Sequence, residues 1–332
     1  MIDTNKLSSQ YRRRILKEDT KQVLIANLYE SIQSQDSDSL VNCCGYGRVR
    51  EFFSFAQFLN QDRDGIGKPL WRGEKPTLKL RSQTFQLAAC NWRCWYCFVE
   101  DGHLSANKMQ SEFMTSKQLI DLYLNEVDRA KIIDLSGGQP FIVPEWLLWM
   151  TQEVENRCPE DTSIWVDDNL SNYFLWKYLT KKDLSYLSSF RNLSIAGCFK
   201  GFDSESFQFN TKSEKEGFTR QLDIARRLIK QGFNTYYYVS LTSQILDSST
   251  IRKRIKKFID ELQVIDEYLP LRVIPLKIYP FNTVKSRKFN FDMEKVLTSQ
   301  HIAYEYWLNE LDLRYQSSVR ELGYDDINLN GD

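Results

Sequence analysis

The stretch LAACNWRCWYCFVEDG, residues 87–102, holds three of the seven cysteines of the chain within eight positions. The thiols stand at Cys90, Cys94 and Cys97 and follow the spacing Cys-x3-Cys-x2-Cys. An odd, clustered set of cysteines in a long chain indicates metal or redox chemistry and disfavours a disulfide framework. Three thiolates can hold three irons of a [4Fe-4S] cluster, which leaves the fourth iron open to a substrate or cofactor.

Outward from this stretch, short β-rich runs alternate with amphipathic helical patterns. Strands are predicted at 84–88, 132–136, 164–167, 193–196, 235–241 and 273–279. Apolar residues at helical spacing predict helices between them, among them 116–127, 218–229 and 251–262. Such units imply parallel strands with right-handed crossovers, in an open doubly wound sheet or a partial barrel. In either fold the loops at the carboxyl ends of the strands carry the reactive groups, and the three cysteines follow the first strand.

The composition restricts the class of protein. Of 332 residues, 42% are hydrophobic and 14% aromatic, as in a folded globular chain. Forty-four basic residues balance 44 acidic ones, which removes a general attraction to phosphate and disfavours nucleic acid as a partner. No apolar run approaches the roughly 18 residues that cross a bilayer, and the N-terminus has no signal-peptide pattern. We therefore expect a cytoplasmic protein without membrane contact.

The cysteine spacing, with Tyr96 just before the last cysteine, resembles the signature of the radical S-adenosylmethionine (SAM) superfamily. "LSGGQP" (135–140), at the end of the second predicted strand, is similar to the Gly-Gly-acid-Pro motif of that superfamily, with Gln139 in place of the usual Glu. The resemblance covers about residues 84–280. It is closest to little-characterised Fe-S oxidoreductases and more distant to wybutosine-forming tRNA enzymes.

The resemblance implies an α/β fold with a partial (β/α)6 TIM-like barrel over residues 81–285. A mostly helical N-terminal extension (1–80) and a C-terminal helical segment (286–332) are expected beside it. Within the extension, the apolar residues between Val23 and Ile32 predict one helix, and Phe52 to Leu59 predict another.

The resemblance also implies the cofactors, a [4Fe-4S] cluster on Cys90, Cys94 and Cys97, and SAM. Two adjacent glycines let the backbone approach a ligand closely, so their carbonyl groups suit the amino group of SAM. Asp168 and Asn169, after the third strand, can hydrogen-bond ribose hydroxyls or simply cap the next helix. The expected cofactor-binding residues are Tyr96, Phe98, Gly137, Gly138, Gln139, Asp168, Asn169 and Lys200.

"IAGCFKGFD" (195–203) resembles the Asp-x-Lys tip of glycyl-radical activating enzymes, with Cys198 where their Asp would be. Lys200 keeps the cation and can pair with the carboxylate of SAM. Cys198 has two interpretations: a buried small hydrophobe, the usual place of a free cysteine, or a catalytic thiol that returns a hydrogen atom to a substrate radical.

The resemblance implies reductive cleavage of SAM to a 5'-deoxyadenosyl radical, which abstracts hydrogen from a small-molecule or peptide substrate. The electron would come from a flavodoxin-like or ferredoxin-like donor. The alternatives within the class are a glycyl-radical-enzyme activase and a tRNA-modifying enzyme. An alternative of another class is a binding module without catalysis, stabilised by a Cys3His zinc site that His103 completes.

Overall fold

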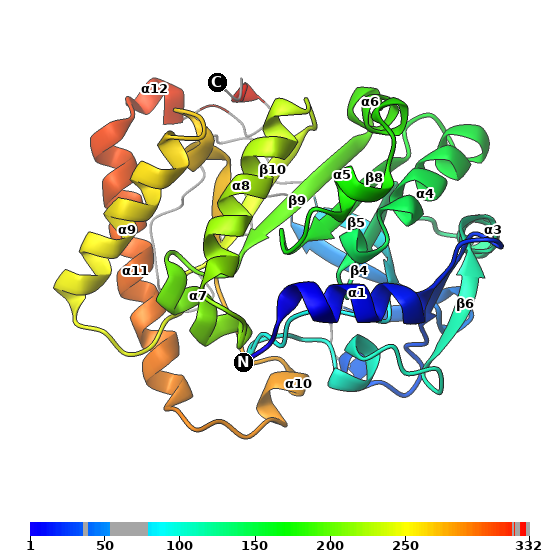
Figure 1. Cartoon of the computed structure of the whole chain (residues 1–332), viewed down its shortest axis with the longest axis horizontal. Coiled ribbons are helices and arrows are strands. Elements are labelled where there is room, and N and C mark those ends of the chain that lie inside the picture. Colours follow the sequence, from blue (N-terminus) through cyan, green and yellow to red (C-terminus); the bar gives the residue numbers. More distant parts are fainter. Residues whose placement is uncertain (36–38, 54–78, 321, 323–325, 330–332) are drawn as a thin grey trace.

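The computed structural model describes residues 1–35, 39–53, 79–320, 322 and 326–329 (Figure 1). Its main sheet has eight strands in the order β11-β10-β9-β8-β7-β5-β4-β3. Six of them pair in parallel and follow one another along the chain. These six are β5 (Lys79–Gln86), β7 (Ile132–Ser136), β8 (Ser163–Asp168), β9 (Leu193–Phe199), β10 (Thr235–Ser240) and β11 (Val273–Leu276). The predicted series of six parallel strands is confirmed.

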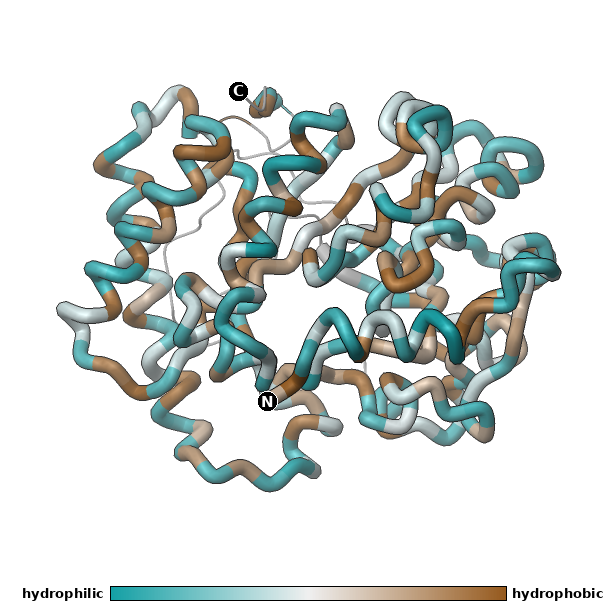
Figure 2. Tube along the Cα trace, in the orientation of Figure 1, coloured by the Kyte–Doolittle hydropathy of each residue, from teal (hydrophilic) through white to brown (hydrophobic). Residues whose placement is uncertain are grey.

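Helices connect these strands and surround them, from α3 at one side of Figure 1 to α9 and α11 at the other. The predicted helices correspond to α3 (Ser116–Asn125), α8 (Glu216–Lys230) and α9 (Ser248–Gln263). The further long helices are α4 (Pro144–Arg157), α6 (Lys181–Ser189), α7 (Ser204–Thr211) and α11 (Met293–Arg314); the short ones are α5 (Phe174–Tyr178), α10 (Asn282–Lys285) and α12 (Ser317–Arg320). The outer helices alternate hydrophilic and hydrophobic turns (Figure 2), as expected when one face packs on a sheet. None of the described helices is long and apolar enough to cross a bilayer.

The main sheet is strongly curved. In a flat sheet β4 (Gly47–Phe53) and β10, five positions apart in the strand order, would be separated by about 24 Å. Arg50 on β4 nevertheless lies close enough to Tyr238 on β10 to lower the pKa of its hydroxyl, against the larger effect of burial. The strand order has two ends, at β11 and β3, so the curved sheet is an open, partial barrel, as predicted.

The N-terminal region differs from the prediction. The expected helix between Val23 and Ile32 is wrong, because Gln22–Ala26 form the strand β2. This strand pairs with β1 (Leu16–Lys17) and β6 (Ser111–Thr115) in a separate three-stranded sheet. The pairing buries four consecutive residues, whereas a surface helix would bury one stripe.

In the described part of this region the α-helix is α1 (Thr4–Ile15), capped by Asp3, whose side chain accepts from the Lys6 N–H. Further along, β3 (Ser39–Asn42) and β4 add an antiparallel hairpin to the main sheet. The expected helix at 52–59 is wrong at its start, because Phe52 and Phe53 belong to β4; the rest lies outside the described residues. The domain boundaries at 80 and 285 stay a prediction.

Candidate functional site

Residues 87–102, here called the cysteine loop, leave β5 at the carboxyl edge of the parallel sheet. Backbone hydrogen bonds hold the loop at both ends: Cys90 N–H donates to the carbonyl oxygen of Leu104 (3.0 Å), and Trp95 N–H to that of Asn210 (3.1 Å). Cys90, Cys94 and Cys97 are free thiols, each partly buried. The structure thus places the three cysteines where the sequence predicted them.

The three thiols are close enough to influence one another. Burial raises the pKa of Cys94 to about 12; the nearby Lys200 ammonium opposes this rise, while Cys97 and Cys90 add to it. Burial also raises the pKa values of Cys90 and Cys97. The metal-free thiols are therefore protonated at neutral pH, and metal binding must release those protons.

The chemistry of this donor set suits an iron-sulfur cluster. A [4Fe-4S] cluster takes each thiolate on a different iron. Cys90, Cys94 and Cys97 would hold three of the irons.

Lys200, just after β9, is the cation of the site. Burial alone would lower the pKa of its ammonium, but the neighbouring Cys198, Tyr96 and Cys94 reverse this and raise it. Its backbone is held on both sides, by the Gln221 side chain at the N–H (3.1 Å) and by the Asn210 amide at the carbonyl (2.8 Å). Lys200 is therefore a fixed positive charge beside the thiols.

Cys198, near the end of β9, belongs to the same group of side chains. Burial raises the pKa of its thiol to about 12, and Lys200 opposes the rise. Its Sγ lies 4.0 Å from the carbonyl oxygen of Ala196, so its hydrogen bonding within the described chain is weak. The thiol is protonated at neutral pH and retains its S–H hydrogen.

The Gly-Gly stretch packs directly against the cysteine loop. Gly137 has a positive φ of 81°, and a Cβ at Gly138 would overlap the carbonyl oxygens of Leu87 and Ala89. The next residue, Gln139, donates its N–H to Ala89 O (2.7 Å). Only glycine permits this approach of the two backbones.

The side chain of Gln139 forms a hydrogen bond at both ends of its amide group. Its Nε2 donates to Asp168 Oδ2 (2.5 Å), and its Oε1 accepts from the Asn169 N–H (2.9 Å). Asp168 also accepts from the backbone N–H groups of Leu170 (2.6 Å) and Phe141 (3.3 Å). Burial still raises the pKa of Asp168 to about 7, although these hydrogen bonds oppose the rise.

Asn169 reaches the first cysteine. Its Nδ2 lies 3.7 Å from Cys90 Sγ and donates to Asn91 Oδ1 (3.0 Å). Its own Oδ1 is buried and has no hydrogen-bond partner in the described part of the chain. An unpaired buried acceptor costs free energy, so this oxygen suits a donor on a bound ligand.

The two aromatic candidates lie in different surroundings. Tyr96 is buried, and its hydroxyl shares a 2.6 Å hydrogen bond with Ser240 Oγ at the end of β10. Phe98 faces the Arg48 guanidinium at 4.9 Å and the Phe281 ring at 6.2 Å. Tyr96 therefore adjoins the thiols and Lys200, whereas Phe98 faces β4.

Three site residues were missed from the sequence. Asn210 accepts the indole N–H of Trp95 (2.9 Å) and donates to the carbonyls of Lys200 and Thr242 (2.8 and 2.9 Å). Arg93 and Arg287 bind carbonyl oxygens of the cysteine loop. Isolated arginines and asparagines carry no spacing signal, so only their contacts reveal them.

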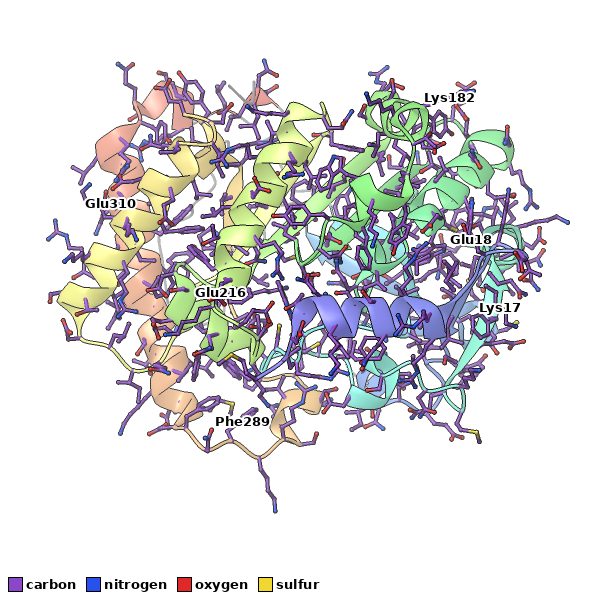
Figure 3. The ribbon with its side chains drawn as sticks, in the orientation of Figure 1. Lys17, Glu18, Lys182, Glu216, Phe289 and Glu310 are labelled. Carbon is purple, nitrogen blue, oxygen red and sulfur yellow. The ribbon has the colours of Figure 1, made fainter. Side chains whose placement is uncertain are left out.

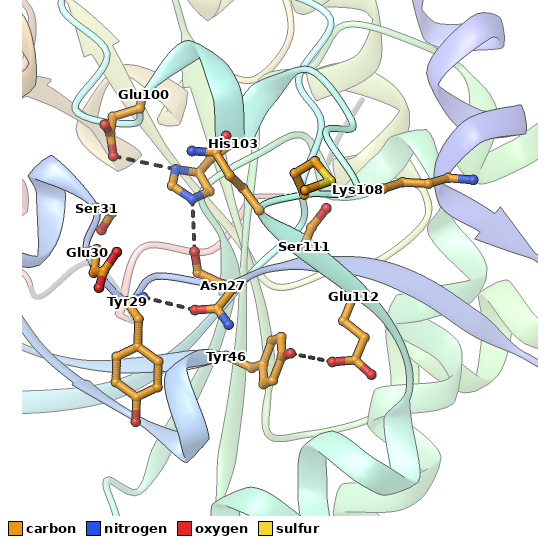
Figure 4. Close-up of a pocket in the computed structure, with 12 residues that line it drawn as sticks. Asn27, Tyr29, Glu30, Ser31, Tyr46, Glu100, His103, Lys108, Ser111 and Glu112 are labelled. Atoms are coloured by element: carbon orange, nitrogen blue, oxygen red, sulfur yellow. Dashed lines mark hydrogen bonds and ion pairs between the residues drawn. The ribbon is translucent and has the colours of Figure 1, made fainter.

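The ring nitrogens of His103 face groups of a polar pocket (Figure 4). Its Nε2 contacts the carbonyl oxygen of Asn27 at 2.9 Å, and its Nδ1 lies 3.6 Å from Glu100 Oε2. It lines a polar pocket of about 650 Å³ together with Tyr46 and Glu112. With both ring nitrogens facing these groups, His103 does not complete a Cys3His site.

The concave face of the sheet, beside this site, is polar. Burial, and then the neighbouring Asp167, raise the pKa of Asp134 on β7 to about 7. Its Oδ2 accepts from Thr84 (3.0 Å), whereas its Oδ1 is buried and has no hydrogen-bond partner among the residues that the structure describes. Both carboxylates act on the pKa of Cys198, which places them near that thiol. This face therefore presents carboxyl groups that can form hydrogen bonds.

Comparison with known proteins supports this assignment. Residues 80–216 match the family described as "4Fe-4S single cluster domain". The match contains the three cysteines, the Gly-Gly stretch and Lys200. The match agrees with the predicted resemblance to the radical SAM superfamily and supports the expected [4Fe-4S] cluster. No curated protein matches the chain.

Among solved structures, Streptococcus suis SuiB bound to S-adenosylmethionine is similar at 13% identity and a TM-score of 0.43, over 68% of this chain and 46% of SuiB. SuiB bound to the precursor peptide SuiA gives 12% identity and a TM-score of 0.43, over 70% of this chain and 46% of SuiB. The chain thus spans less than half the length of SuiB. A likeness of this size says nothing about activity, and the assignment rests on the motif and the family match.

Proposed function

We propose that this protein cleaves SAM reductively at a [4Fe-4S] cluster and uses the resulting radical to abstract hydrogen from a small-molecule or peptide substrate. The single observation that carries the proposal is the meeting of three free thiols with the fixed cation of Lys200 at the carboxyl edge of the parallel sheet. When bound, the cluster and SAM supply the one-electron cleavage that yields the 5'-deoxyadenosyl radical.

The residues of the chain divide the task of binding SAM. The Lys200 ammonium suits its carboxylate, and the backbone carbonyls at Gly137 and Gly138 suit its amino group. Asn169, through its unpaired Oδ1, is better placed to accept a ribose hydroxyl than Asp168, whose oxygens already accept three hydrogen bonds. Tyr96 excludes water beside the cluster.

The concave polar face is the proposed substrate site. Asp134 offers an unpaired Oδ1 to a donor group of the substrate, and Asp167 lies beside it. Cys198, between this face and the thiols, holds its S–H where a substrate radical would receive hydrogen. An electron donor of the flavodoxin or ferredoxin type completes the proposal.

The test is anaerobic reconstitution followed by reaction with SAM and dithionite. We expect about four irons per chain and release of 5'-deoxyadenosine. Cys94→Ala should abolish the release, because the cluster loses one of its three ligands. The matched control is Cys158→Ala, since Cys158 lies at the distant end of α4. One zinc per chain without iron, or a loaded cluster that leaves SAM intact, would refute the proposal.

A further inference from the structure

Two arginines bind opposite arms of the cysteine loop. On the first arm, residues 90–93, Arg93 donates through Nη1 to the carbonyl oxygens of Cys90 (2.6 Å) and Trp92 (2.8 Å). Its Nη2 bonds the Tyr11 hydroxyl (2.7 Å) and the Leu104 carbonyl (3.2 Å). The first arm is thereby tied to α1 and to its own loop.

Arg287, nearly 200 residues further along the chain, binds backbone carbonyl groups of the second arm, residues 95–99. Its Nη1 donates to the carbonyl oxygens of Trp95 (3.1 Å) and Cys97 (2.7 Å), and its Nη2 to that of Val99 (2.9 Å). A guanidinium presents a rigid fork of donors, so one side chain can fix three carbonyl groups of an irregular loop.

The segment that carries Arg287 lies between α10 and α11 and covers the second arm with aromatic rings. Trp95 makes edge contacts with Phe289 and Phe291 at centroid distances of 5.8 and 5.4 Å. Figure 3 shows Phe289 on this segment. The side chain of Arg287 is only 20% exposed, so its charge acts through a poorly solvated region.

We propose that Arg287 is a positioning residue for the iron-sulfur cluster, which fixes the arm bearing Cys97 and raises the reduction potential of the cluster. Reduction adds negative charge, and a nearby cation favours the reduced state. Hydrogen bonds to cluster sulfurs also set the potential, and the amide of Val99, the residue whose carbonyl Arg287 binds, faces the Cys97 sulfur. The inference rests on the cluster assignment above.

The first measurement needs no cluster. In the metal-free full-length chain, Arg287→Met should accelerate amide hydrogen exchange over residues 95–99 by roughly tenfold or more, because charge-assisted hydrogen bonds are lost. Residues 90–93, held by Arg93, should change much less. Lys288→Met is the matched control, since Lys288 is an exposed neighbour of the same charge. If exchange in Arg287→Met equals that of the control, the positioning role is wrong.

The second measurement is the midpoint potential of the reconstituted cluster. Arg287→Met should lower the potential and the iron content per chain. Arg287→Lys retains the charge but lacks the forked guanidinium donors. It should therefore keep the potential near that of the natural protein, while amide hydrogen exchange over residues 95–99 is still faster. Equal potentials in all three proteins would overturn the electrostatic part of the proposal. Failure of every protein to bind iron would instead refute the cluster assignment and leave the exchange result intact.

Discussion

At the level of single residues, the hydrogen bonds of Gln139 explain why glutamine suits the position where the motif usually has glutamate. Its amide is both donor and acceptor, and it uses the two functions on neighbouring partners, Asp168 Oδ2 and the Asn169 N–H. A glutamate here would accept from Asn169 equally well but would press a second carboxylate against Asp168. Glutamine at position 139 therefore complements the carboxyl group of Asp168 on the adjacent strand β8.

This pairing predicts the outcome of Gln139→Glu. Placing two buried carboxylates in contact should lower the free energy of unfolding by about 3 kcal/mol at pH 8. The double variant Gln139→Glu with Asp168→Asn should recover most of the loss, because one donor amide then faces one carboxylate. Urea denaturation of the three proteins measures both effects, and a double variant no more stable than Gln139→Glu would contradict the pairing.

The same pair has a defined pH dependence. Burial raises the folded-state pKa of Asp168 to about 7 from an ordinary value of 3.8. A carboxyl with a raised pKa favours the folded state when protonated, so its contribution is lost as pH rises from about 4 to about 7. The loss caused by Gln139→Glu should accordingly be smaller at pH 5, where a shared proton relieves the repulsion, than at pH 8.

The residues predicted from the sequence are those that stand in short motifs with a characteristic spacing. The cysteine triplet, the two glycines and Lys200 stand in short motifs, and the structure brings them together. Arg287 and Asn210 escaped notice because their roles depend on contacts with distant segments. Asp168 lies beside Gln139 and Asn169 in the structure, but its three accepted hydrogen bonds cannot be foreseen from the sequence.

At the level of elements, helix α1 presents one face to the cysteine loop. Thr4, Ser8 and Tyr11 stand at positions i, i+4 and i+7, which lie along one side of a helix. Thr4 accepts the indole N–H of Trp92 (2.9 Å), and Ser8 accepts from the Asn91 amide (2.8 Å). Tyr11 accepts from Arg93. The helix thus contacts three successive residues of the first arm.

Thr4→Val tests this contact. Valine keeps the shape of threonine but removes the acceptor, which leaves the buried Trp92 indole N–H unpaired and should cost about 1–3 kcal/mol of stability. Thr20→Val, at an exposed position in the turn before β2, should change stability by less than about 0.5 kcal/mol. Thermal unfolding, followed by tryptophan fluorescence, compares them; equal losses would show that α1 does not support the loop through Thr4.

The elements also show what periodicity can predict. The strands β7 to β10 were found within a few residues, because each is a short apolar run closed by turn residues. β2 was taken for a helix because its partner β6 lies more than 80 residues further along, and a sequence pattern does not show which segments pair. The α1 helix was missed because its mostly polar surface carries a weak apolar pattern.

At the level of the whole molecule, the cysteine loop joins α1 near the N-terminus to the segment between α10 and α11. Its first arm contacts α1, and its second arm contacts the segment before α11. We therefore expect that occupation of the proposed cluster site affects the order of both segments.

Removal of the cluster should make this coupling visible. In the reconstituted protein treated anaerobically with a chelator, hydrogen exchange should accelerate at residues 4–15 and 281–291, the segments that hold the loop. Helix α9, which holds neither the loop nor Lys200, should keep its exchange rates and serve as the internal control. Mass spectrometry of peptides from both states gives the comparison, and a uniform change along the chain would argue against the coupling.

The contact of Arg287 with Cys97 also imposes an order of events during synthesis. The two residues are 190 positions apart, so at 5–20 residues per second about 10–40 s separate their appearance at the ribosome. Throughout that interval the nascent chain displays its thiols with only one arm held. A cluster inserted during this interval would bind a loop whose second arm is not yet fixed. Stable cluster binding must therefore wait until the segment with Arg287 has been synthesised.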